Sequence, residues 1–111
     1  EQIQAQLAKL TGAWFRFFVQ YDPQPALRRV DVPVLALYGG KDLQVPPDQN
    51  ADPMRSALSN SPGDDGTVRV LDGLNHLFQP AETGLPRQYA RIDTTMAPRA
   101  LNTVSEWIRD Q

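Results

Sequence analysis

The sequence predicts an α/β fold built on one parallel strand–helix–strand unit with a helix at each end. Two short apolar runs indicate the strands: residues 32–38 are nearly all apolar, as in a strand covered on both faces of a parallel sheet, and residues 67–71 form the second run. A polar segment of helical length, 48–58, separates them. Because parallel strands need a crossover connection, this order favours a βαβ unit.

The first 21 residues predict two short helices or one broken helix, interrupted at Thr11-Gly12 and ended by Asp22-Pro23. Apolar residues recur at helical spacing in both pieces: Ile3, Leu7 and Leu10, then Trp14, Phe18 and Tyr21. We expect the aromatic face of the second piece to pack in a core or against another domain, and less readily to line a substrate pocket.

The rest of the chain predicts a capped middle helix, a long irregular segment and a final helix. Asp48 is expected to cap the middle helix, and residues 60–66 form the turn that ends it. The irregular segment covers residues 77–97. The last helix opens with Pro98 in its first turn.

Composition allows one domain for the 111 residues and gives little sign of charged partners. The net charge is −2 with Lys and Arg scattered, and no apolar stretch reaches the roughly 20 residues of a membrane span, so we expect neither nucleic acid nor membrane as a partner. With no cysteine and a single histidine, we expect no disulfide, metal site or cofactor. Nothing indicates the cellular compartment.

Asp42 and His76 are the candidate site residues because each directly follows one of the predicted strands. If the strands are neighbours, their carboxyl ends lie at the same edge of the sheet, and the two side chains come within hydrogen-bonding reach. An acid in this position fixes the tautomer of a histidine and stabilises its charged form. Two plainer interpretations stay open: Asp42 as a turn residue that bonds its own backbone, and His76 as a structural or solvated side chain.

The residues around this pair resemble the end of α/β-hydrolases. The resemblance lies in residues 39–46, Gly-Gly-Lys-Asp-Leu-Gln-Val-Pro, and in residues 73–79, Gly-Leu-Asn-His-Leu-Phe-Gln, and it extends over essentially the whole chain. It is closest to bacterial carboxylesterase and serine-aminopeptidase-like members. The resemblance implies that the two strands are the seventh and eighth of an eight-stranded sheet, and that residues 1–111 are the C-terminal fragment of a single hydrolase domain.

The same resemblance implies that Asp42 is the acid and His76 the base of a catalytic triad. Asp72 lies close to His76 in the sequence, but the family places the acid after the preceding strand. The family also implies that the nucleophile and the oxyanion hole come earlier in the chain. No serine here lies in a Gly-x-Ser-x-Gly elbow; the four are Ser56, Ser59, Ser61 and Ser105.

These features predict that the parent protein hydrolyses a small-molecule ester, thioester or amide through an acyl-enzyme, and that this chain alone is inactive. A different class of function is also compatible with the sequence. A two-stranded parallel sheet leaves open edges, so the chain could be a non-catalytic module that self-associates or docks onto a separate chain carrying the rest. Either way we expect a homo-oligomer or association with the missing N-terminal part.

Overall fold

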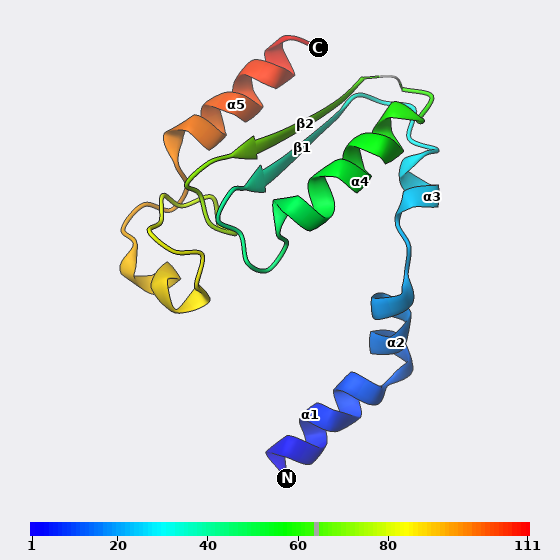
Figure 1. Ribbon diagram of the computed structural model, residues 1–111, viewed down its shortest axis with the longest axis vertical. Helices are drawn as coiled ribbons and strands as arrows, with labels where there is room; N and C mark the ends of the chain where they lie inside the picture. Colours follow the sequence, from blue (N-terminus) through cyan, green and yellow to red (C-terminus); the bar gives the residue numbers. More distant parts are fainter. Residues whose placement is uncertain (64) are drawn as a thin grey trace.

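The computed structural model describes residues 1–63 and 65–111, and it has a mixed α/β architecture (Figure 1). The elements follow in the order α1 (Gln2–Thr11), α2 (Ala13–Gln20), α3 (Gln24–Leu27), β1 (Val34–Gly39), α4 (Pro47–Ser59), β2 (Gly66–Leu71), the 3₁₀ helix η1 (Pro86–Arg91) and α5 (Pro98–Arg109). The predicted parallel βαβ unit with flanking helices is confirmed. Asp64, in the predicted turn at 60–66, lies outside the described residues.

The sheet consists of β1 and β2, paired in parallel from Val34 opposite Gly66 to Gly39 opposite Leu71. The crossover helix α4 lies on one side of the strands and α5 on the other (Figure 1). Near the carboxyl end of α4, the side chain of Leu58 occupies the space that a Cβ at Gly66 would need. The carboxyl end of α4 therefore lies beside the amino end of β2, and both strands end at the opposite edge.

The best-packed core lies next to that opposite edge. Leu74, Ala97 and Ala100 are buried together, with Leu71 and Phe78 packed against them. Because Leu74 precedes His76 by two positions, the loop that carries the histidine is anchored in this core. A second buried group lies along α4 and the end of β1: Tyr38, Ala51, Ala57 and Leu58.

The prediction that residues 32–38 are covered on both faces is wrong for most of the strand. Val34 to Leu37 are only partly buried, and burial begins at Tyr38 and Gly39. β1 has β2 as its one strand neighbour among the described residues, so its outer edge has no partner. An apolar run indicates that a strand is suited to burial, but it does not supply the element that would cover it.

Helices α1 and α2 form an N-terminal arm, residues 2–20, that extends away from the sheet (Figure 1). The break at Thr11-Gly12 is confirmed, but neither helix has a buried residue. Trp14 is 73% exposed and Phe18 62% exposed, and their rings stack on each other with centroids 5.6 Å apart. The expectation of a core position is therefore wrong within the described chain, and contact with another domain stays a prediction.

Three local features differ from or refine the sequence-based expectations. Asp48 does not cap α4: Pro46 is the N-cap residue, and the Asp48 charge instead lies in the first turn, near the positive end of the helix dipole. The short helices α3 and η1 were not predicted, because each carries a proline in its first turn and has little apolar periodicity. Helix α5 begins at Pro98 as predicted.

Candidate acid–histidine site

The loops that follow β1 and β2 bring Asp42 and His76 together. Asp42 Oδ2 lies 2.8 Å from His76 Nδ1, although the residues are 34 positions apart in the sequence. The parallel register explains this contact, since Gly39 and Leu71 end their strands side by side and both loops leave at the same edge. The structure thus places both candidate residues at one site, while their catalytic roles stay predictions.

The Asp42 carboxylate is held from two directions. Its Oδ1 accepts hydrogen bonds from the backbone amides of Gln44, at 2.8 Å, and Val45, at 2.9 Å, while Oδ2 faces His76. The side chain is buried, with 7% of its surface exposed. The turn interpretation and the acid interpretation of Asp42 are therefore compatible, because each uses a different oxygen.

These contacts determine the protonation of Asp42. Burial raises the pKa of the Asp42 carboxyl, but hydrogen bonds from the Val45 amide and the His76 ring lower it, with a further contribution from Gln44. The hydrogen bonds outweigh burial, so the pKa of Asp42 lies below its ordinary value and the group is a carboxylate at neutral pH.

The charge on Asp42 settles which ring nitrogen of His76 carries the proton. An ionised carboxylate only accepts hydrogen bonds, so His76 Nδ1 must donate in the 2.8 Å contact. In the neutral ring, Nε2 then has a free lone pair. The His76 side chain is 34% exposed, so part of the ring is accessible from solvent.

A tight turn of buried amides presents His76. Asn75 is fully buried; its Oδ1 accepts from the amides of Leu77 and Gln79, both at 3.0 Å, and its Nδ2 donates to Gln79 Oε1 at 2.8 Å. Phe78 has a φ of 56°, a left-handed conformation that is uncommon for an aromatic residue and must be held by its surroundings. Sequence reasoning gave Asn75 and Gln79 no role.

Glycine is required where the two loops approach each other. A Cβ at Gly39 would overlap the backbone carbonyls of Leu74 and Asn75. The Lys41 amide donates to the Leu74 carbonyl at 2.8 Å, which continues the contact between β1 and β2 into the loops. The Gly-Gly pair that precedes Lys41 therefore sets how closely two turns approach: residues 40–46, which carry Asp42 and are called the acid turn, and residues 72–76, which carry His76 and are called the histidine turn.

The other acidic candidates do not contact the histidine. Asp72 is exposed, and Asp52 pairs with Arg55 on the surface of α4. Neither is a hydrogen-bond partner of His76 in the described part of the chain. Asp72 follows β2 as Asp42 follows β1, but it is exposed and does not contact His76. A substitution at Asp72 is therefore a useful control for a substitution at Asp42.

No serine lies at the site among residues 1–63 and 65–111. The hydroxyls of Ser59 and Ser61 donate to backbone carbonyls at the end of α4, at the edge of the sheet opposite His76. Ser56 lies within α4 and Ser105 within α5. The described residues therefore supply an acid and a base without a serine beside them.

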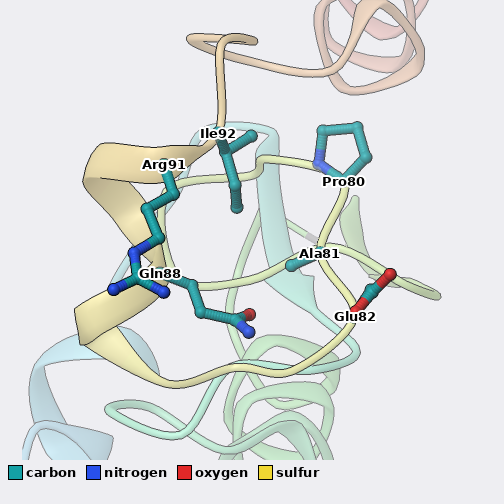
Figure 2. A pocket seen from close by; sticks show the side chains of 6 residues that line it. All are labelled: Pro80, Ala81, Glu82, Gln88, Arg91 and Ile92. Atoms are coloured by element: carbon teal, nitrogen blue, oxygen red, sulfur yellow. The ribbon is translucent and has the colours of Figure 1, made fainter.

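Two small cavities lie in the described part of the chain. One, of about 260 Å³, separates the segment after the histidine turn from η1 (Figure 2) and is lined by Pro80, Ala81, Glu82, Gln88, Arg91 and Ile92. The other, of about 200 Å³, is lined by Asp22, Pro23, Gln24, Leu27, Tyr38, Asn50, Pro53 and Met54. Neither lining includes Asp42 or His76, so neither cavity is the place where this pair would act.

Two further observations apply to the described part of the chain. It contains no cluster of three or more His, Cys, Asp or Glu side chains arranged to hold a metal ion. None of its helices has the length and apolar character needed to cross a membrane.

Comparison with known proteins gives no relative: no family model, no curated protein and no solved structure matches this chain. The function of this chain must therefore be inferred from its residues and their geometry.

The lowered pKa of Asp42 predicts how stability depends on pH. The folded pKa lies below the unfolded value of about 3.9, so Asp42 stabilises the fold above that pH, and this contribution is lost as the pH falls through the folded pKa. Asp42→Asn should cost about 1.5–3 kcal/mol at neutral pH, and the difference from the unaltered chain should shrink below about pH 4. Urea unfolding across this range measures it; a difference that does not change with pH would contradict the assignment.

Proposed function

We propose that this chain is the C-terminal part of a serine hydrolase of the α/β-hydrolase type, in which Asp42 and His76 are the triad acid and base. The observation that carries the proposal is the 2.8 Å contact between Asp42 Oδ2 and His76 Nδ1 at the carboxyl ends of adjacent parallel strands. A turn residue needs only its own backbone as a partner. The second oxygen of Asp42, directed at the ring, supports the acid role.

The chemistry follows from the state of the ring. His76 Nε2 takes the proton of an attacking hydroxyl as that oxygen bonds to the acyl carbon, and later transfers the same proton to the leaving group. Asp42 stays ionised throughout; it holds the tautomer and stabilises the charged imidazolium. Water then hydrolyses the acyl-enzyme by the same proton transfers. The substrate class is a small-molecule ester, thioester or amide.

The nucleophile belongs to a segment outside this chain. Among the described residues, Ser59 and Ser61 donate to backbone carbonyls at the end of α4, Ser56 and Ser105 lie within helices, and none is a hydrogen-bond partner of His76. The open edge of β1 supports the same conclusion, because a central strand of a larger sheet would pair there. The chain alone should therefore have no hydrolytic turnover.

The test is an assay of nitrophenyl-ester hydrolysis on the complete gene product that contains these residues. His76→Ala and Asp42→Asn should each lower kcat by roughly 10³-fold or more, because each removes a member of the acid–base pair. Asp72→Asn is the matched control, because Asp72 is exposed and lies four positions before His76. It should leave kcat unchanged. The 111-residue chain should not exceed its own His76→Ala variant.

Two results would contradict this proposal. Activity of the complete product that survives His76→Ala would remove the histidine from the reaction. Saturable turnover in the isolated chain that disappears in His76→Ala would mean that a nucleophile lies within these residues.

We infer a second candidate function, self-association, from the amount of uncovered surface. The chain exposes 8090 Å², whereas a folded monomer of this size is expected to expose about 6,100 Å². Its radius of gyration is 16.8 Å, against about 13 Å for a compact domain of this length. The excess of exposed surface, roughly 2,000 Å², is larger than the ~800 Å² that each partner buries in a standard interface. A second copy of the chain would cover the aromatic face of the arm and the open edge of β1.

Self-association predicts a dimer or larger species by sedimentation equilibrium. Replacing two arm residues, Trp14→Asp with Phe18→Asp, should shift the chain toward monomer, because it places charges in the exposed aromatic face. Gln20→Asp on the same helix adds charge at a polar position and should have little effect. A chain that stays monomeric at high micromolar concentration would exclude this candidate and leave the hydrolase proposal untouched.

A further inference from the structure

We call the irregular segment 77–97 the strap. It follows the histidine turn, passes over the acid turn and then leads into α5. Its first part contacts the acid turn through Lys41, whose Nζ donates to the carbonyls of Ala81 at 2.7 Å and Glu82 at 2.9 Å. Its 3₁₀ helix contacts the same turn through Tyr89, whose hydroxyl accepts from Gln44 Nε2 at 2.8 Å. The strap therefore touches the acid turn at two separate places.

Close packing supports these polar contacts. Gly84 is buried, and a Cβ built there would overlap the backbone carbonyl of Lys41 and the side chain of Leu43. The strap thus lies directly on the acid turn at this point. In Figure 2, residues 80–82 and η1 lie on opposite sides of the cavity. The strap is therefore a loop that folds back on itself, and it is anchored at both ends.

The anchor on the histidine side is the amide of Gln79, which is only 6% exposed. Its Oε1 accepts from Asn75 Nδ2 at 2.8 Å, and its Nε2 lies 3.2 Å from the Thr94 carbonyl and 3.4 Å from that of Tyr89. One buried side chain therefore joins the turn that presents His76 to the later part of the strap. Removing it would leave buried donors and acceptors without partners, which is costly.

Together these bonds form a closed network around the candidate site. From the Asp42–His76 contact, the network continues through the histidine turn to Gln79, from Gln79 to Tyr89, and through Gln44 back to Oδ1 of Asp42. Movement of either turn away from the other must break one bond of this network or stretch several of them.

We propose that the strap positions His76 against Asp42, with Gln79 and Tyr89 as positioning residues that act through the histidine turn and the acid turn. This inference rests on the proposed acid–base role of the pair. A strap that merely covered the core would change the free energy of unfolding without changing where the ring proton of His76 lies in the folded chain.

His76 is the sole histidine of the sequence, so the two ring nitrogens of ¹⁵N-labelled histidine report its tautomer without overlap. At alkaline pH, where an imidazole is neutral, the unaltered chain should have the proton on Nδ1. Gln79→Met keeps the length of the side chain and removes its polar atoms; the ratio of the Nδ1–H to the Nε2–H form should fall by roughly fivefold, the factor given by one net hydrogen bond. Gln49→Met, exposed on α4, is the control and should leave the ratio unchanged.

Tyr89→Phe is the second variant, because its lost bond is exposed and the chain should stay folded. It should lower the same ratio by a smaller factor and raise the pKa of Asp42, measured from the carboxyl ¹³C signal. Tyr21→Phe in the arm is its control.

The outcomes separate the two proposals. A proton on Nε2 in the unaltered chain would contradict the acid–base pair itself. A proton on Nδ1 that is retained in folded Gln79→Met and Tyr89→Phe would overturn the strap and leave the pair intact. If Gln79→Met does not fold, the Tyr89→Phe result alone decides.

Discussion

The parallel pairing of β1 with β2 is the constraint from which the geometry of the site follows. The register places Gly39 beside Leu71, so the segments that follow β1 and β2 leave the sheet at one edge and in the same direction. The absence of a side chain at Gly39 then allows the histidine turn to approach the acid turn, and the bond from the Lys41 amide to Leu74 extends the strand contact by one step. The register, Gly39 and this backbone hydrogen bond bring Asp42 and His76 together without any need for attraction between their side chains.

Buried polar groups make this edge of the sheet rigid. Asp42, Asn75 and Gln79 are the buried polar side chains of the described residues, and no buried side-chain nitrogen or oxygen there lacks a partner. Because breaking any one of these bonds would strand a desolvated group, the arrangement resists local opening. Other surfaces are less well covered: the arm, the outer edge of β1 and the apolar face of α5, where Leu101 and Ile108 are exposed, have no cover among the described residues.

The sequence predicted what depends on local pattern and topology. Apolar runs located both strands, and the positions of Asp42 and His76 after them predicted their approach on the condition that the strands are neighbours, because parallel neighbours share an edge. It did not predict the contacts of Gln79, since sequence spacing does not reveal which carbonyls an amide will meet. The exposure of Trp14 and the only partial burial of Val34 to Leu37 were also missed. Periodicity identifies an apolar face, whereas its burial depends on which other elements lie against it.

The proposed chemistry depends on Asp42 and His76 forming a hydrogen-bonded acid–base pair. Its most direct test is the proton spectrum of the sole histidine in the unaltered chain and in Asp42→Asn. Such a pair should give a low-field resonance from the His76 Nδ1 proton, protected by the carboxylate from rapid exchange with water, and this resonance should be lost in Asp42→Asn while the chain stays folded. A resonance that is absent from the unaltered chain, or that persists in the variant, would show that the pair does not form.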